Sequence, residues 1–206
     1  SLVPLITIAE KEFSGFRTLV LGDMRKIGYA LEDFGVIHFS ERYSSASQDR
    51  YAVFTTETGL EKQVTQRDMS QGMFRAFSVL VQVNYYILSG NKGFVIIDDI
   101  GEGLDFARAK LLVKLLIRKA GKAKIQLIMS TNDQFIMNAV DIENWAVIMR
   151  EGNKISLFNY ENSREIFEEF KFTGLNNFDF YASEFFREGM KDLEDEGLFS
   201  DGPEGE

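Results

Sequence analysis

The sequence predicts an α/β protein: a mostly parallel sheet flanked by helices, followed by a β-hairpin and C-terminal helices. Two segments, residues 94–98 and 124–131, each have the length of one strand, and the first is continuously apolar until Asp98. Between them, residues 105–121 have helical spacing, with basic side chains toward the end where the helix dipole favours cations. Strand, helix and strand in this order predict a right-handed βαβ crossover. Because the first strand is apolar without alternation, we expect it to be buried on both faces.

The residues before this unit predict a helix and two paired strands. Residues 19–34, "LVLGDMRKIGYALEDF", predict a helix interrupted by glycines. Residues 49–59 alternate and are rich in β-branched and aromatic residues, so they predict a strand that ends in a turn at Gly59. The stretch "EKQVTQ" predicts a short return strand.

A long helix is predicted from Ser70 to Leu88. Its start is open between two N-caps: Asp68, with Gln71 three positions later as in a capping box, and Ser70 itself. Gly90 predicts its end. The apolar side chains that share one face are Met73, Phe77, Leu80, Val81 and Leu88.

The last part of the chain changes to hairpin and helical patterns. Residues 145–160 predict a hairpin whose turn is either Glu151-Gly152 or Gly152-Asn153. The segments "SREIFEEFKF" and "FDFYASEFFREGM" predict helices. We interpret the 19 Phe residues as core packing, not as a platform on which bases stack.

Composition excludes several kinds of site. There is no cysteine, which excludes disulfides and thiolate metal sites, and the single histidine, His38, leaves almost no material for a His-based metal site or a Ser-His-Asp triad. No apolar run of about 18 residues and no signal pattern occurs, so we expect a cytoplasmic protein that has no membrane partner. Residues 191–206 hold seven acids and one lysine, and we expect an acidic, disordered tail over 189–206.

Carboxylates are concentrated where the strand at 94–98 ends. Asp98 and Asp99 are adjacent, and Glu102 follows three residues later. Repulsion and desolvation oppose this arrangement, so a cation is expected beside it. Ligands of parallel α/β sheets bind beyond the carboxyl ends of the strands, and Mg²⁺ needs only one or two protein carboxylates beside water and phosphate oxygens. The pattern therefore predicts a site for Mg²⁺ and a nucleotide.

Three further stretches agree with this interpretation in order and spacing. "MSQGMFR" (69–75) opens the long helix, "GLD" (103–105) follows the carboxylates, and "IMSTNDQF" (128–135) ends the next strand. With residues 94–99, this set resembles the C-terminal lobe of the ABC-type ATPases, a superfamily that includes SMC and RecF proteins and the OLD-like ATPases of phage-defence systems. The resemblance covers roughly residues 50–180 and implies a P-loop NTPase-like fold, with ATP and Mg²⁺ as cofactors.

The resemblance implies a role for each carboxylate. Asp98 matches the Walker B residue that holds Mg²⁺, directly or through water. Asp99 stands where the family usually has a Glu that orients or deprotonates the attacking water. Because Asp is one methylene shorter, Glu102 could assist in catalysis.

The other stretches match the signature motif, the D-loop and the switch. Ser70, Gln71, Gly72 and Arg75 belong to the signature stretch, whose helix N-terminus would meet the γ-phosphate bound to a second subunit. Asp105 matches the D-loop residue that contacts that subunit. Ser70 and Asp105 can equally be plain N-caps.

Asn132 stands at the switch position, where these ATPases usually have His, and would hydrogen-bond the γ-phosphate. A simple turn residue is the alternative for Asn132.

A phosphate-cradling loop of the form G-x-x-x-x-G-K-[ST] is absent from the sequence. Since the chain begins at Ser1, we expect it to be the C-terminal lobe of a longer ATPase or half of a split one, with an N-terminal Walker A lobe as its partner. Residues 1–48 would be a helical lead-in and residues 49–188 the lobe itself.

Two functions remain open. One is an ATPase that forms homodimers or higher homo-oligomers through ATP in a DNA-related or anti-phage defence activity. The other is a poorly hydrolysing assembly module that gates an effector such as a nuclease. Asp99 and Asn132 favour the second.

Overall fold

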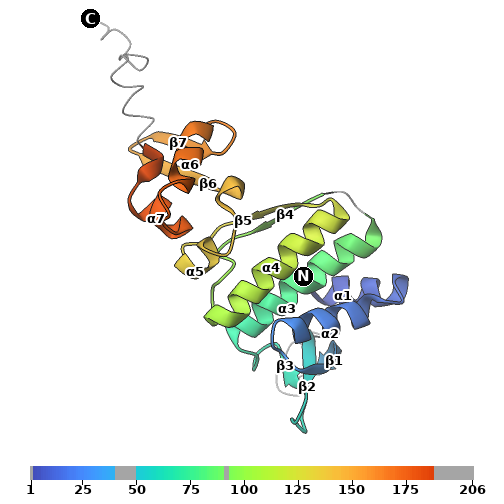
Figure 1. Cartoon of the computed structure of the whole chain (residues 1–206). Helices are drawn as coiled ribbons and strands as arrows, with labels where there is room; N and C mark the ends of the chain where they lie inside the picture. Colours follow the sequence, from blue (N-terminus) through green and yellow to red (C-terminus); the bar gives the residue numbers. More distant parts are fainter. Residues whose placement is uncertain (1, 40–49, 91–92, 188–206) are drawn as a thin grey trace, which may run out of the picture. The chain divides into compact units, whose positions relative to one another are not determined.

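The computed structural model describes residues 2–39, 50–90 and 93–187 (Figure 1). The chain divides into two compact units between Asn132 and Asp133. The acidic tail expected over 189–206 lies outside the described residues.

The described residues of the first unit form four helices and five strands. In chain order they are α1 (Leu2–Glu12), α2 (Phe16–Lys26), β1 (Leu31–Phe39), β2 (Arg50–Glu57), β3 (Val64–Thr65), α3 (Gln71–Ser89), β4 (Phe94–Ile97), α4 (Phe106–Ala123) and β5 (Gln126–Met129). β1, β2 and β3 form an antiparallel sheet, and β4 pairs with β5 in parallel.

The prediction of a helix over residues 19–34 is wrong beyond Lys26. The helix ends there, Gly28 takes a left-handed conformation (φ 90°), and β1 begins at Leu31. The long pairing of β1 with β2 overrides the local helical pattern, as tertiary context commonly does. This pairing joins residues on both sides of the boundary expected at 48/49, so residues 1–48 are not a purely helical lead-in.

The strands predicted at 49–59 and in "EKQVTQ" are confirmed as β2 and β3. The helix predicted from Ser70 is also confirmed. Ser70 is its N-cap, since the Ser70 hydroxyl accepts a hydrogen bond from the Met73 N–H, and Gly90 ends the helix in the left-handed region (φ 66°). Asp68 instead accepts a hydrogen bond from the Thr65 hydroxyl.

Aromatic packing joins α2, β1 and α3. The Phe34 ring makes edge-to-face contacts with Phe16 and Phe77, at centroid distances of 6.2 and 5.2 Å. All three side chains are fully buried. They fix the orientation of α3, the helix whose first turn belongs to the candidate site.

The predicted βαβ unit is present, but its sheet is covered on only one face. β4 and β5 are parallel and joined by α4, which lies beside α3 (Figure 1). Ile97 is buried, whereas Phe94 and Ile96 are 63% and 64% exposed, and Ile128 of β5 is 47% exposed. The expectation of burial on both faces is therefore wrong for the described residues.

The second unit is built around a β-hairpin. β6 (Ala146–Glu151) pairs antiparallel with β7 (Lys154–Asn159), and Glu151 faces Lys154, so the turn is Gly152-Asn153. Gly152 has a positive φ (57°), as such a tight turn requires. The remaining elements are α5 (Gln134–Met137), η1 (Ile142–Asn144), α6 (Arg164–Lys171), α7 (Asn177–Ala182) and η2 (Phe185–Arg187).

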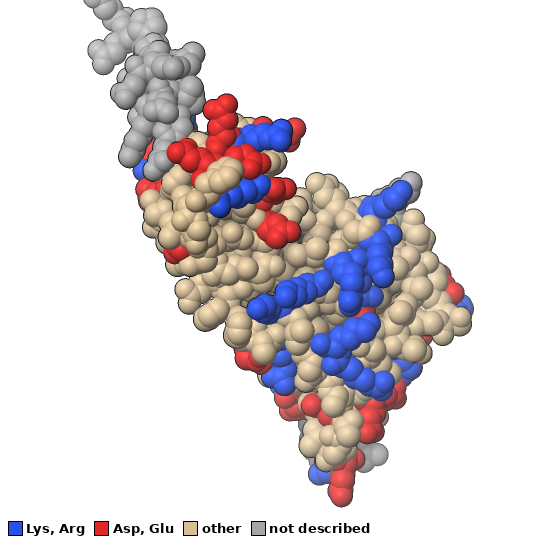
Figure 2. Space-filling model, in the orientation of Figure 1, with Lys and Arg blue, Asp and Glu red and all other residues tan. Residues whose placement is uncertain are grey.

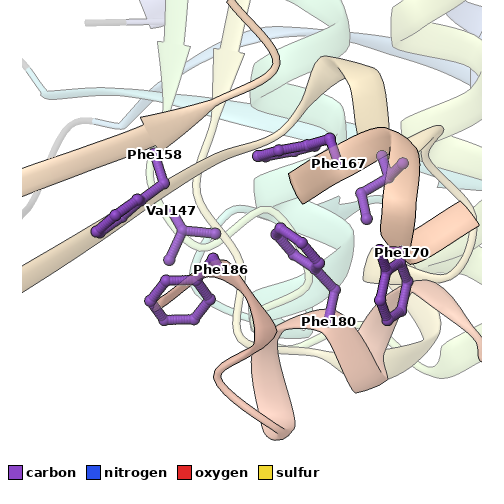
Figure 3. Close-up of a cluster of buried hydrophobic side chains, with 7 residues drawn as sticks. Val147, Phe158, Phe167, Phe170, Phe180 and Phe186 are labelled. Carbon is purple, nitrogen blue, oxygen red and sulfur yellow. The ribbon is translucent and has the colours of Figure 1, made fainter. Parts of the chain in front are cut away.

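Phenylalanines form the core of this second unit, as predicted. Figure 3 shows Phe167, Phe170 and Phe180 in one cluster, and the Phe180 ring contacts the other two, with centroid distances of 4.6 Å to Phe167 and 5.0 Å to Phe170. The buried cluster consists of Ile142, Val147, Phe158, Phe167, Phe170, Phe180 and Phe186. Trp145, Met149, Tyr160, Ile166 and Phe185 pack around this cluster, so we interpret its phenylalanines as structural.

Charge on the first unit is locally basic although the net charge of the chain is −9. Figure 2 shows Lys and Arg side chains gathered over α4. That helix contains six basic residues and no acidic one: Arg108, Lys110, Lys114, Arg118, Lys119 and Lys122. None of the described helices is long and apolar enough to cross a membrane.

Candidate functional site

The carboxyl ends of β4 and β5 bring two polar residues together. Asp98 follows β4 and Ser130 follows β5, and the Ser130 hydroxyl donates a hydrogen bond of 2.5 Å to Asp98 Oδ1. The same hydroxyl accepts a hydrogen bond of 2.8 Å from the Asp99 backbone N–H. Asp98 is exposed. One exposed carboxylate at a strand end fits a Mg²⁺ ion that takes its other ligands from phosphates and water.

Ser130 is a site residue that the sequence interpretation missed. It lies in the polar stretch "IMSTNDQF", from which only Asn132 was selected. A hydroxyl directly after the second parallel strand was the available signal, because neighbouring parallel strands end at the same sheet edge.

The turn after Asp98 has an unusual backbone. Asp99 has a φ of 43°, in the left-handed region that non-glycine residues seldom occupy, although Asp tolerates it better than most. The Arg75 guanidinium donates hydrogen bonds to the backbone carbonyls of Asp98 and Asp99, the second at 2.8 Å. Asp99 thus follows the strand end in a conformation supported by α3.

The first turns of α3 also bind Glu102. Arg75 Nη1 lies 2.8 Å from Glu102 Oε2, and Gln71 Nε2 donates to Glu102 Oε1 at 3.1 Å. The carboxylate expected to assist catalysis is therefore occupied by two residues of the predicted signature stretch.

Gly72 approaches the backbone of the "GLD" stretch closely. A Cβ on Gly72 would lie 2.0 Å from the Gly103 carbonyl oxygen, which real Cβ atoms do not tolerate. Gly103 itself has a φ of 75°. Glycine is required at both positions, because one needs space and the other needs a positive φ.

Asp105 is the N-cap of α4. Its carboxylate accepts hydrogen bonds from the Arg108 backbone N–H at 3.0 Å and from the Arg108 guanidinium at 2.6 Å. These hydrogen bonds, the backbone one first, lower the pKa of Asp105. The guanidinium also lies over the Tyr29 ring, 4.6 Å from its centroid. The prediction that Asp105 is an N-cap is therefore confirmed, whereas its D-loop role stays a prediction.

Asn132 is not joined to this cluster. It is exposed two residues beyond Ser130, and within the described residues its side chain makes no hydrogen bond to Asp98, Asp99 or Glu102. Nor do the described residues include a group of three His, Cys, Asp or Glu side chains arranged to hold a metal. A groove of about 530 Å³ in the second unit, lined by Trp145 and Tyr160 among others, contains none of the predicted site residues.

A buried ionic network lies elsewhere in the first unit. The Asp23 carboxylate, with 1% of its side chain exposed, is bonded by Lys119 at 2.7 Å, Lys26 at 2.9 Å and the Asn84 amide at 2.9 Å. Burial alone would raise the pKa of Asp23, but hydrogen bonds from Lys119, Asn84 and Lys26 outweigh it and lower the pKa. This network ties α2, α3 and α4 together.

The α/β fold and the acidic residues at the carboxyl end of a parallel strand indicate a class of protein, the α/β domains of P-loop NTPase type. The family described as "AAA domain, putative AbiEii toxin, Type IV TA system" matches residues 11–138. The chain belongs to that AAA-domain family.

Solved structures confirm the fold. An Smc head domain with an extended coiled coil, bound to the C-terminal domain of ScpA and derived from Pyrococcus furiosus, is 17% identical, with a TM-score of 0.52 over 80% of this chain and 40% of that one. An Smc head domain with a coiled coil and joint from Pyrococcus yayanosii is 16% identical, with a TM-score of 0.51 over 80% and 31%. An SmcHead bound to the C-winged helix domain of ScpA is 17% identical, with a TM-score of 0.52 over 75% and 46%.

The chain thus spans less than half the length of these three head structures. No curated protein matches it.

Proposed function

We propose that the chain is the C-terminal lobe of an ABC-type ATPase head, which binds and hydrolyses ATP when a Walker A lobe joins it. The supporting observation is the group formed by Asp98, Asp99 and Ser130 at the carboxyl end of two parallel strands, beside the first turn of α3. This is where parallel α/β folds bind ligands.

Each residue of that group has a distinct task in the proposed reaction. Asp98 holds Mg²⁺, directly or through water, and Mg²⁺ when bound neutralises phosphate charge. Ser130 orients the Asp98 carboxylate through its hydrogen bond. Asp99 orients the attacking water and accepts its proton. Asn132 contacts the γ-phosphate.

The uncovered face of β4 and β5 supports a Walker A lobe as partner. Parallel sheets are found buried on both faces, and a sheet of two short strands is marginal alone. Phe94, Ile96 and Ile128 leave an apolar surface on this one. A lobe that adds strands and covers this face, in the same or a separate chain, would remove that surface from water.

The N-terminus of α3 supports dimerisation through ATP. Ser70 is exposed and caps a helix of 19 residues, whose free N–H groups and dipole favour an anion. We propose that this end meets the γ-phosphate bound to a second copy, with Asp105 at the same interface.

The process that ATP drives is proposed from the family and from charge. The family description names a putative AbiEii toxin of a type IV TA system, which supports a role in defence. The basic band over α4 (Figure 2) supports DNA as a partner, because exposed Lys and Arg neutralise phosphates.

A poorly hydrolysing assembly module is the second candidate. Glu102, the residue that could assist the shorter Asp99, is already bonded to Arg75 and Gln71. Since these bonds hold Glu102 away from a role as second base, the head would close on ATP but hydrolyse it poorly, and its closure would gate an effector such as a nuclease.

One experiment tests both candidates. The full protein that carries the Walker A lobe is assayed for ATP affinity and turnover, as wild type and as Asp98→Ala, with exposed Asp141→Ala as control. Asp98→Ala should weaken binding and abolish turnover, whereas Asp141→Ala should change neither. Tight ATP binding with negligible wild-type turnover would favour the assembly module, and no ATP binding would refute both.

A further inference from the structure

The turn after β4 is held from two sides. On one side the Asp99 N–H donates to the Ser130 hydroxyl of the neighbouring strand end. On the other, one guanidinium nitrogen of Arg75 donates to the carbonyls of both Asp98 and Asp99. Since Asp99 occupies the left-handed region, its conformation depends on such external support.

Arg75 joins the turn to Glu102 as well. Its second guanidinium nitrogen binds the Glu102 carboxylate, which Gln71 also binds. A planar guanidinium offers its donors in a fixed geometry, so one side chain can hold two carbonyls and a carboxylate at once. Three quarters of the Arg75 side chain is shielded from solvent, since it is 25% exposed.

The backbone of α3 touches the same loop. Gly72 packs so closely on Gly103 that neither backbone can move toward the other. The first turn of α3 is therefore attached to both ends of the loop 98–103, by Arg75 at its start and by Gly72 at its end.

We propose that Arg75 is a positioning residue that couples the N-terminus of α3 to the Asp98-Asp99 turn, instead of contacting the nucleotide. This rests on the proposed function, in which the N-terminus of α3 meets the phosphate of a second copy. A shift of α3 on that contact is transmitted through Arg75 to the carbonyls of Asp98 and Asp99, and so to their carboxylates. Glu102 orients Arg75 and is not the base.

The first experiment measures the turn directly. Amide hydrogen exchange of residues 98–103 is compared in this chain for wild type, Arg75→Gln and Arg118→Gln, the last replacing an exposed arginine of α4. Loss of a hydrogen bond from a charged donor predicts exchange about 10- to 100-fold faster in Arg75→Gln. Arg118→Gln should exchange like wild type. Arg75→Lys, which keeps the charge but not the planar donors, should resemble Arg75→Gln and guards against a variant that fails to fold.

The second experiment uses the full protein with its Walker A lobe. Arg75→Gln should lower kcat about 10- to 100-fold while ATP affinity stays within about 2-fold, because the catalytic carboxylates are misplaced but no phosphate contact is lost. Reversing the ion pair in Arg75→Glu with Glu102→Arg should not restore kcat, since the carbonyls need the arginine at position 75.

Two outcomes would overturn the coupling role. One is unchanged exchange of residues 98–103 in Arg75→Gln. The other is a fall in ATP affinity as large as the fall in turnover, which would make Arg75 a ligand contact. If wild-type protein binds no ATP, the proposed function is wrong and the coupling of two nucleotide sites falls with it, while the exchange data still decide whether Arg75 holds the turn.

Discussion

Two groups of carboxylates in the first unit differ in how their charge is compensated. Asp23 is buried and has three donors within 3 Å, from Lys119, Lys26 and Asn84. At the end of β4, Asp98 is exposed and its Oδ1 atom accepts a hydrogen bond from a neutral hydroxyl, while Glu102 is half exposed and bonded to Arg75 and Gln71. The buried group is internally complete and holds helices together. The exposed group leaves charge for a ligand, which is what a binding site requires.

The largest expected effect comes from breaking the buried group. Asp23→Ala would leave the Lys119 ammonium, whose side chain is only 14% exposed, without its carboxylate, so we expect a loss of about 3–5 kcal/mol in the free energy of unfolding. Asp33→Ala, which removes an ion pair with Arg17 at the surface, should cost at most about 1 kcal/mol. Urea denaturation of both variants measures the difference. If both variants lost a similar free energy of unfolding, the buried Asp23 network would contribute no more to stability than the surface ion pair of Asp33.

A smaller effect is expected from crowding the loop of the exposed group. Gly72→Ala forces a Cβ into the Gly103 carbonyl, and overpacking of this kind costs about 1–3 kcal/mol. Gly121→Ala is a matched control, since that helical glycine has nothing within 4 Å of its Cβ position and alanine should stabilise the helix by about 0.5–1 kcal/mol. Thermal unfolding of the two variants should therefore shift in opposite directions. A stabilised Gly72→Ala would contradict the close packing of α3 on the loop.

The third prediction concerns acid. The pKa of Asp23 is lowered by its partners, so its carboxylate contributes stability above the unfolded pKa of about 3.9 and loses it as pH falls through the lower folded value. Between pH 7 and pH 3, the free energy of unfolding should therefore fall more steeply in wild type than in Asp23→Asn. Urea denaturation across this range gives both slopes. Equal slopes would mean that the ionised state of Asp23 is not favoured in the folded protein.

The smallest effect is expected for the pair Arg75–Glu102. Because Glu102 is 47% exposed, solvent screens the pair, and a double-mutant cycle with Arg75→Gln and Glu102→Gln should give a coupling of about 0.2–1 kcal/mol. A coupling of several kcal/mol would mean that the Arg75–Glu102 pair stabilises the fold as strongly as the buried Asp23 network, and would support a structural role for Glu102.

Part of the fold could be predicted because its signals lie within a few residues of one another. The stop at Gly90 was predicted, and Ser70 and Asp105 were among the predicted N-cap alternatives, because such contacts lie inside one helical turn. The βαβ order followed from two strand-length segments and the helical spacing between them. β1 was missed because the pattern of residues 31–34 also fits a helix, and only its pairing with β2 decides against it.

The candidate site was predicted in position but not in its contacts. The carboxylates at the end of β4 lie where the pattern placed them, but Ser130 was overlooked, and the bonds of Glu102 to Arg75 and Gln71 were not foreseen. Gln71 and Glu102 are 31 residues apart, and Asp98 and Ser130 are 32 apart. No local spacing encodes such a pair.

The sequence alone determined the features that depend on neighbouring residues: that helices cover most of residues 70–88 and 105–121, that two carboxylates follow β4, and that phenylalanines form the core of the last unit. Only the tertiary structure decided that Asp23 and Asn84, 61 residues apart, share a buried charge with Lys119. It also decided that Arg75 holds the Asp98-Asp99 turn and that Phe94 and Ile96 of β4 are exposed in the part of the chain that the structure describes. The physical reason is range: caps and periodicity act within one or two turns of chain, whereas burial and ion pairing depend on which distant segments the core brings together.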